Sequence, residues 1–214
     1  MISTDVKTNQ QYADKIRIFF ESSGMNAVFK DVSTDIISRI ELLGERLSDH
    51  AGRPVVDNII SRVKSPESIM RKLVRKNREV TPQNALTTLH DLIGIRVVCP
   101  FQDDVFHLAE EISRNIGYEV VNIKDFVSKP KSSGYRSIHI ILACHDASGN
   151  QFFAEIQVRS VAMNYWAILD HLLCYKSEDE RVRALHEQLK ECAEDIAAID
   201  RKFYKLRRKI EKLN

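Results

Sequence analysis

Cysteine, glycine, proline and long apolar runs are all scarce in this sequence. Its four cysteines (Cys99, Cys144, Cys174 and Cys192) stand far apart without a C-x-x-C pair, which favours reduced, partly buried thiols over a disulfide framework or a zinc site. Seven glycines and five prolines exclude collagen-like or low-complexity character. The longest apolar run, IHIILAC, falls far short of the roughly 20 residues of a membrane span. The polar start MISTDVKTNQ predicts no secretory signal. We therefore expect a soluble, cytoplasmic protein.

Charge of one sign is not in excess either, since the formal net charge is only +2. Any binding of a polyanion must therefore come from local clusters of Lys and Arg. The 214 residues, 43% of them hydrophobic, are enough for one substantial core with flanking helices.

Hydrophobic periodicity predicts the order of helices and strands. We expect helices over residues 5–23, 26–48, 65–77, 103–115, 160–175 and 178–212, and strands within 55–65, 92–99, 118–126, 136–144 and 152–159. Helices around such strands, with at least one βαβ crossover, predict an α/β (α+β) fold with a mixed β-sheet of about five strands. We divide the chain into N-terminal helices (1–50), a core (51–176) and a C-terminal helix (177–214).

The C-terminal helix carries the clearest repeat in the chain. Its apolar residues alternate at spacings of three and four, as in the a/d seam of a coiled coil: Val182, Leu185, Leu189, Cys192, Ile196, Ile199, Phe203, Leu206, Ile210 and Leu213. A helix packed on its own domain would also explain the pattern. Because the helix is long for a small domain, we expect it to join subunits of a homo-oligomer.

Two strands place polar side chains on one face of the sheet. In AEIQVR, the alternation of a strand sets Glu155, Gln157 and Arg159 opposite the core. In the preceding strand, taken to begin at Tyr135, the same alternation groups Tyr135, Ser137 and His139. The short turn HDASGN predicts that the two strands pair as a hairpin. Together they predict a ligand-facing surface, although a solvated sheet face is the simpler alternative.

Residues 61–78 are strongly basic. They hold seven cations against the single acid Glu67: Arg62, Lys64, Arg71, Lys72, Arg75, Lys76 and Arg78. Like charges about 4 Å apart repel by about 4 kcal/mol at an effective dielectric constant of about 20, so an anion among them would relieve the repulsion. Ser65-Pro66-Glu67 is a helix start, whose backbone N–H groups suit phosphate. The alternative is a solvated basic helix face.

Asp91 stands at the entry of the strand LIGIRVVC. Asp91 and Arg96 cannot share a face of an unbroken strand, so either Asp91 precedes the strand or Gly94 makes a bulge. With Glu155, Asp91 would supply the oxygen ligands of Mg²⁺ bound to a polyphosphate. The alternative is a helix-capping Asp91 and a surface Glu155. His90-Asp91 also resembles the dyad of metal phosphohydrolases, but the other histidines show no matching arrangement of ligands.

These features together fit transfer of a phosphate-containing group from a nucleotide. The residues alone do not identify the acceptor.

Four motifs in order, RVKS (62–65), DLIGIRV (91–97), PKSSGYRSIH (130–139) and EIQVR (155–159), resemble the synthetase domain of the RelA/SpoT family. The tail AMNYWAILDH (162–171) is similar to that of its single-domain members, the small alarmone synthetases. The resemblance implies a nucleotidyltransferase-like sheet. It also implies transfer of the β,γ-pyrophosphate of ATP to the 3′-hydroxyl of GDP or GTP, which makes (p)ppGpp in the stringent response.

The resemblance also implies roles for individual residues. Arg62 and Arg96 would sandwich the adenine of ATP. Its phosphates would be bound by Lys64, Ser68, Lys72 and Arg75. Asp91 and Glu155 would be catalytic and would coordinate Mg²⁺, with Glu155 also the general base for the 3′-hydroxyl. The guanosine nucleotide would be bound by Lys131, Tyr135, Ser137, His139, Gln157 and Arg159, with Tyr135 stacked on guanine.

Two positions near the tail are less regular. Asp170 stands where many members have Glu, one methylene longer, so the sequence departs from the family's pattern at a residue that would contact the donor nucleotide. Asn164 matches one residue of an allosteric cleft in some homotetrameric members.

Two other functions stay open: a toxin of this family that modifies the tRNA 3′ end or adenosine nucleotides, and a non-catalytic nucleotide sensor. Tyr135 and His139 favour a guanosine nucleotide without a need for nucleic acid, while Asp91 and Glu155 favour catalysis. The choice among GDP, GTP and GMP is not fixed by the sequence.

Overall fold

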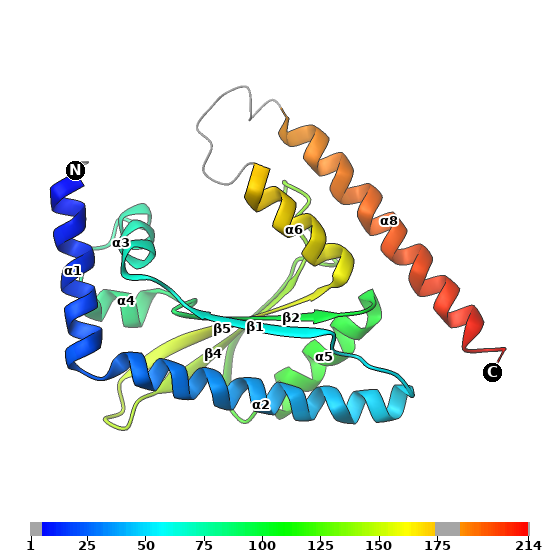
Figure 1. Ribbon diagram of the computed structural model, residues 1–214, viewed down its shortest axis with the longest axis horizontal. Helices are drawn as coiled ribbons and strands as arrows, with labels where there is room; N and C mark the ends of the chain where they lie inside the picture. Colours follow the sequence, from blue (N-terminus) through cyan, green and yellow to red (C-terminus); the bar gives the residue numbers. More distant parts are fainter. Residues whose placement is uncertain (1–5, 174–184, 214) are drawn as a thin grey trace.

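A five-stranded mixed sheet forms the centre of the computed structural model, which describes residues 6–173 and 185–213 (Figure 1). The strands are β1 (Asn58–Val63), β2 (Ile93–Cys99), β3 (Glu119–Asp125), β4 (Ile138–His145) and β5 (Gln151–Ser160). Their order is β1-β2-β5-β4-β3. Only β2 and β5 are parallel neighbours, and the other pairs are antiparallel. The predicted mixed sheet and the β4–β5 hairpin are confirmed.

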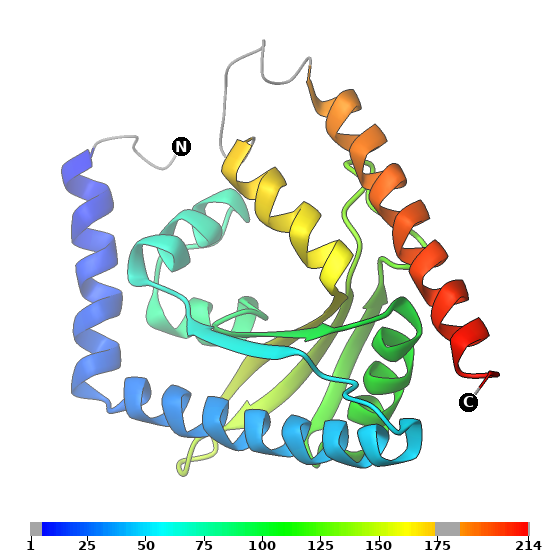
Figure 2. The same ribbon diagram turned by 45° about the vertical axis from the view of Figure 1, so that its right-hand side comes forward.

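Long helices cover one face of this sheet. α1 (Val6–Ser22) and α2 (Met25–Ala51) meet at Gly24, whose positive φ of 73° suits glycine at the sharp corner between them. α2 and α5 (Gln102–Asn115) lie below the sheet in Figures 1 and 2. The side chains of β5 that face them, Ala154, Ile156 and Val158, are fully buried. The alternation predicted for β5 is therefore confirmed.

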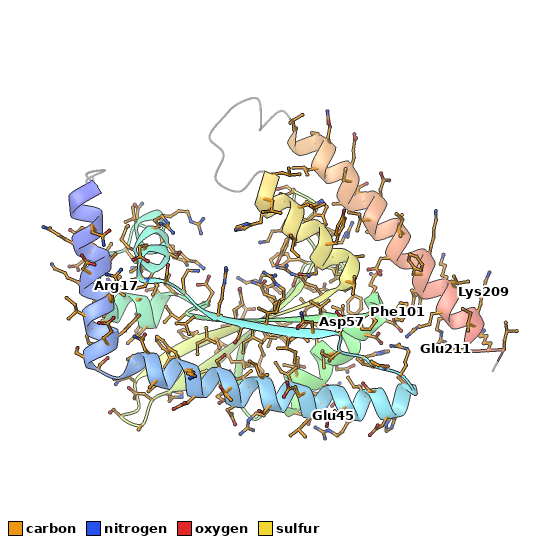
Figure 3. All side chains as sticks on the ribbon, viewed as in Figure 1. Arg17, Glu45, Asp57, Phe101, Lys209 and Glu211 are labelled. Atoms are coloured by element: carbon orange, nitrogen blue, oxygen red, sulfur yellow. The ribbon has the colours of Figure 1, made fainter. Side chains whose placement is uncertain are left out.

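The opposite face lies between α3 (Pro66–Arg75) and α6 (Val161–Leu173), as both ribbon views show. α3 begins as predicted, because Ser65 Oγ accepts from the backbone N–H of Ser68 at 3.3 Å and Pro66 occupies its first turn. Arg17 of α1, labelled in Figure 3, pairs with Glu67 of α3 and ties this helix to α1. This leaves the polar face of the sheet open between two helices.

Two points of the expected fold need correction, and one alternative that the sequence left open is decided. A short helix, α4 (Pro82–Thr88), was not predicted, although Thr81 caps it and Pro82 starts it. β4 begins at Ile138 rather than at residue 135 or 136, because the preceding residues form a turn and its return. Asp91 precedes β2, and the strand pairing continues past Gly94 without a shift, so Gly94 makes no bulge.

The last described helix, α8 (His186–Ile210), runs alongside α6. The predicted helix residues 178–184, with Val182 of the seam, lie outside the described residues. The indole N–H of Trp166 donates to the Leu189 carbonyl at 2.9 Å. Leu189 therefore lies near α6. Most other described seam residues are exposed: Leu185, Cys192, Ile199, Phe203, Leu206, Ile210 and Leu213.

An ion-pair cluster holds the end of α8 on the core. Arg207 pairs with Asp103 at the start of α5, and Arg53 binds the buried Asp104 through two hydrogen bonds of 2.8 Å. The guanidinium groups of Arg53 and Arg207 lie 5.1 and 4.7 Å from the ring centre of Phe101, which Figure 3 labels beside this end of α8. The exposed face of α8 is therefore not a sign of a detached helix.

Two further expectations concern the chain as a whole. Cys99 and Cys144 are buried and Cys192 is exposed, while Cys174 lies outside the described residues. Across residues 6–173 and 185–213, none of the helices combines the length and the apolarity that a bilayer crossing would require.

Candidate functional site

A pocket of about 260 Å³ opens on the polar face of the sheet, over β1, β2 and β5. Five predicted site residues line it: Arg62, Asp91, Arg96, Glu155 and Gln157. Gly94 lies at its floor, because Gly94 pairs with Arg62 on β1 and with Glu155 on β5. A larger residue there would stand between these two side chains. The two predicted acidic residues, far apart in the sequence, therefore face one cavity.

Asp91 lies between two lysines. Lys64 and Lys72 both approach its Oδ2 atom at 2.7 Å. Burial acts to raise the pKa of Asp91, but the hydrogen bonds from these lysines outweigh it and hold the pKa below its ordinary value. Its other oxygen, Oδ1, is buried without a hydrogen-bond partner among the residues that the structure describes. Asp91 is therefore an ionised carboxylate with one oxygen free to bind a ligand.

Glu155 belongs to a closed ring of hydrogen bonds. Its oxygens accept from Nδ1 of His139 at 3.1 Å and from the Gln157 amide at 2.6 Å. Nε2 of His139 pairs with the Tyr135 hydroxyl at 2.8 Å. Arg159 closes the ring by donating to the Tyr135 hydroxyl and to the Gln157 carbonyl oxygen, each at 2.7 Å. Each side chain of the ring thereby fixes the orientation of its neighbours.

The ring also sets the charge of Glu155, whose side chain is only 18% exposed. Burial acts to raise the pKa of Glu155, but the hydrogen bonds from His139 and Gln157 hold it below its ordinary value. The charge of Asp91 opposes this effect, as two carboxylates facing one pocket must. Glu155 is therefore ionised at neutral pH.

A loop after β3 adds a cation and two aromatic rings beside Glu155. The Lys131 ammonium lies 4.7 Å from the ring centres of both Phe126 and Tyr135. Phe126 also meets the His139 ring edge to face at 5.2 Å. Phe126 was not predicted as a site residue, although an aromatic at the entry of a loop rich in lysine and serine was a signal that could have found it. Burial, together with nearby cations, holds the pKa of Lys131 below its ordinary value despite the attraction of Glu155.

Arginines surround the same pocket. Burial, followed by the charges of Arg159 and Arg62, lowers the pKa of Arg96. The Nε atoms of Arg96 and Arg159 are buried without a hydrogen-bond partner among the described residues. Cations gathered in this way repel one another unless an anion or an aromatic base lies among them.

Other predicted residues lie outside the lining of this pocket. Ser68 accepts from Arg71 at 3.0 Å in the first turn of α3, and Arg75 is exposed near the end of that helix. Asn164 and Asp170 lie on α6, half-buried.

Ser137 is the predicted residue whose place differs most. Its side chain is fully buried, and its hydroxyl donates to the backbone carbonyl of Val158 at 3.1 Å. It lies before the start of β4, so its hydroxyl joins the loop to β5 instead of facing the pocket.

The carboxylates of this pocket fit a divalent cation. Mg²⁺ binds one or two carboxylates and completes its octahedron with water and phosphate oxygens, and Asp91 Oδ1 offers an unshared buried oxygen next to Glu155. Elsewhere, Asp103, Asp104 and His107 lie close enough to hold a metal ion. The two carboxylates there already pair with Arg53 and Arg207, so we assign no metal to that cluster.

Comparison with known proteins gives consistent relatives. GTP pyrophosphokinase YwaC of Bacillus subtilis is 30% identical over 187 residues, which are 86% of this chain and 89% of YwaC. GTP pyrophosphokinase YjbM of the same organism is 30% identical over 175 residues, 80% of each chain. The crystal structure of small alarmone synthetase 1 from B. subtilis bound to its product pppGpp matches with a TM-score of 0.76 and 26% identity, over 89% of this chain and 98% of that one.

A family model described as the region found in RelA / SpoT proteins matches residues 61–180. That span contains every lining residue of the pocket except Ile60, both acidic residues and the loop that carries Lys131 and Tyr135. The chain belongs to the RelA/SpoT family.

Proposed function

We propose that this protein is a GTP pyrophosphokinase, which transfers the β,γ-pyrophosphate of ATP to the 3′-hydroxyl of GDP or GTP. The observation that carries the proposal is the shared pocket of Asp91 and Glu155, with the Lys131–Tyr135 loop beside it. Membership of the RelA/SpoT family and the similarity to YwaC and YjbM support the reaction.

The donor nucleotide would lie over β1, β2 and α3. Arg62 and Arg96 would hold the adenine between their guanidinium planes, and the ATP phosphates would take Lys64, Ser68, Lys72 and Arg75. Lys64 and Lys72 contact Asp91 directly, so cationic groups for phosphate lie next to a carboxylate suited to Mg²⁺. The ion, when bound through Asp91 and Glu155, would offset the negative charge of the pyrophosphate group during transfer.

The acceptor would lie over β4 and β5. Guanine would stack on Tyr135, the acceptor phosphates would contact Lys131, and the pocket would be lined by His139, Gln157 and Arg159. In the reaction, Glu155 takes the proton of the 3′-hydroxyl. The freed oxygen attacks the β-phosphorus of ATP, the bond between that phosphorus and the oxygen bridging to the α-phosphorus breaks, and AMP leaves.

The test is product identification. The protein is incubated with ATP, Mg²⁺ and GDP, GTP or GMP in turn, and the products are separated by anion-exchange chromatography. The proposal expects AMP in equal amount with a 3′-pyrophosphorylated guanosine nucleotide, without added nucleic acid. A folded protein that makes no such product would contradict it. Labelling of a tRNA 3′ end or of an adenosine nucleotide would instead identify the toxin-like reaction, and nucleotide binding without turnover would identify a sensor.

We further propose that the exposed seam of α8 joins copies of this chain into a homotetramer, working in the cytoplasm. The seam residues Ile199, Phe203 and Leu206 are each about half exposed. Acidic residues gather in the first half of α8 (Glu187, Glu191, Glu194 and Asp195), and basic ones follow (Arg201, Lys202, Lys205, Arg208 and Lys209). Two such helices side by side in opposite directions would place unlike charges together.

Light scattering at micromolar concentration should show an oligomer. The double variant Phe203→Glu/Leu206→Glu should lower the mass, while the matched variant Lys202→Glu/Lys205→Glu, which alters exposed residues beside the seam, should lower it less. A parent chain that runs as a monomer would refute the assembly without touching the reaction. Asn164 of α6 is the candidate residue for binding an allosteric nucleotide in such an assembly.

A further inference from the structure

Residues 131–135, which we call the acceptor loop, form a tight turn with Ser132 and Ser133 at its tip and Gly134 as its last residue. The Gly134 N–H donates to the Lys131 carbonyl at 2.8 Å, and the Lys131 N–H donates to the Tyr135 carbonyl at 3.2 Å. This turn holds the Lys131 ammonium 4.7 Å from the centre of the Tyr135 ring. Gly134 has a φ of 88°, a backbone conformation that glycine adopts without strain. The relative position of Lys131 and Tyr135 therefore depends on the shape of this turn.

Gly134 lies directly against α8. A Cβ atom added to Gly134 would come within 2.5 Å of the Ala193 Cβ and within 3.5 Å of the Lys190 Cα. Ala193 is 3% exposed, so its methyl group fills the space between α8 and the loop. A side chain at Gly134 therefore has no room unless the loop or the helix moves.

α8 is held firmly enough at this point to support the loop. About two turns further along, the buried Asp200 accepts from the Ser160 hydroxyl at 2.5 Å. Ser160 directly follows Arg159, the residue that closes the hydrogen-bonded ring of the pocket. On the other side of the contact, Trp166 of α6 donates to the Leu189 carbonyl. α8 is therefore fixed to β5 and to α6 on either side of Ala193.

We propose that Ala193 is a positioning residue for the acceptor nucleotide: α8 supports the loop at Gly134 and so sets where Lys131 and Tyr135 meet the guanosine nucleotide. The proposal rests on the proposed function for the identity of the acceptor. In this arrangement one face of α8 orients the acceptor site, while the exposed seam lies on a neighbouring face, roughly 100° around the helix from Ala193. An ordinary packing contact would affect stability alone, whereas a positioning contact changes binding of one substrate and spares the other.

A double-mutant cycle tests the contact. Gly134→Ala introduces the clash and should raise the KM for GDP about tenfold, equivalent to about 1.4 kcal/mol, with the KM for ATP changed less than about twofold. Ala193→Gly removes the opposing methyl group and should recover at least about threefold of that loss in the double variant. Recovery should be incomplete, because alanine at a positive φ stays strained.

A matched control is Ala198→Gly, which has the same cost in helix propensity on α8 but lies roughly 140° around the helix from Ala193. It should recover none of the loss caused by Gly134→Ala. Should Gly134→Ala fail to fold, Ala193→Val carries the test, because it fills the contact from the helix side. It should raise the KM for GDP, whereas Ala198→Val should not.

Hydrogen exchange of the Lys131 and Gly134 amides gives a readout independent of turnover. Both should exchange faster in Gly134→Ala and slow again when Ala193→Gly is added. If the parent chain makes no product, the proposed function fails, yet this exchange cycle still decides whether α8 supports the loop. Effects of the two substitutions that simply multiply, or equal changes in the KM of both substrates, would overturn the proposal.

Discussion

Replacing Glu155 with glutamine is the sharpest test of the proposed chemistry. The change keeps the size of the side chain and removes its charge. In the structure both oxygens of Glu155 accept hydrogen bonds, from His139 at 3.1 Å and from Gln157 at 2.6 Å. Glutamine has one oxygen and one NH₂ group, so one of these two donors would face another donor. The variant therefore loses a carboxylate and leaves one buried polar group without its partner.

These two effects have separate magnitudes. A general base contributes typically 10²- to 10⁴-fold, so kcat should fall by at least about 10², or about 2.7 kcal/mol of transition-state stabilisation. One unsatisfied buried donor costs about 1–3 kcal/mol of folding stability. For a chain of this size that lowers Tm by roughly 4–8 °C at the middle of the range, well short of unfolding at 25 °C. Loss of activity and loss of fold can therefore be measured apart.

The assay is steady-state production of AMP from ATP and GDP, with Tm measured on the same samples. Glu119→Gln is the matched control, because Glu119 is exposed on β3 of the same sheet and loses the same charge. It should keep parental kcat within about twofold, as substitutions on an open surface usually do. A folded Glu155→Gln variant with kcat within about tenfold of the parent would refute the assignment of Glu155 as the base.

Three further outcomes are expected. Tyr135→Ala should raise the KM for the guanosine nucleotide about thirtyfold, since stacking on an aromatic ring is worth about 2 kcal/mol. Tyr135→Phe keeps the ring and should change this KM only a few-fold. Equal losses in both variants would argue against stacking. Arg53→Met leaves the buried carboxylate of Asp104 without its main partner. It should lower the free energy of unfolding by about 3 kcal/mol, with turnover at 25 °C retained. A Tm within about 2 °C of the parent would contradict a stabilising role for this ion-pair cluster. Burial raises the pKa of Asp200. The protonated side chain therefore contributes its full stabilisation below the ordinary pKa of aspartate, and this stabilisation is lost as the pH rises through the raised pKa of the folded state. Asp200→Asn still accepts from Ser160 and should therefore gain Tm relative to the parent as the pH increases, and a constant deficit at every pH would contradict this.

Local patterns in the sequence predicted much of the architecture. The strict alternation of β5 assigned Glu155, Gln157 and Arg159 to one face. Glu155 and Gln157 are half-buried opposite the core and Arg159 is buried beside them, in the hydrogen-bonded ring. The cap and proline at Ser65-Pro66 fixed the start of α3. Both signals act within a few residues, where backbone sterics and hydrogen bonding decide the conformation without help from the rest of the chain.

What could not be predicted depends on contacts between distant segments. Ser137 was assigned to the pocket by counting along a strand. The strand begins at Ile138, the residue after it, and the Ser137 hydroxyl donates to the Val158 carbonyl. Asp104 has the pattern of a solvated acid in the first turn of a helix, yet it is buried because Arg53 reaches it from the end of α2. No periodicity in the sequence indicates the contact of Gly134 with α8.

The position of β5 in the sheet has a consequence for synthesis of the chain. β5 is the last strand to be made, yet it is inserted between β2 and β4 in the middle of the sheet. A growing chain on the ribosome, lengthening by about 5–20 residues per second, can form the antiparallel pairs β1–β2 and β3–β4 early. The edges of β2 and β4 that β5 will pair with stay exposed until β5 emerges. Since β5 brings Glu155 to the pocket, no shorter product of translation contains a working site, and nascent chains that stall before it are expected to be substrates for chaperones or proteases instead of partly active enzymes.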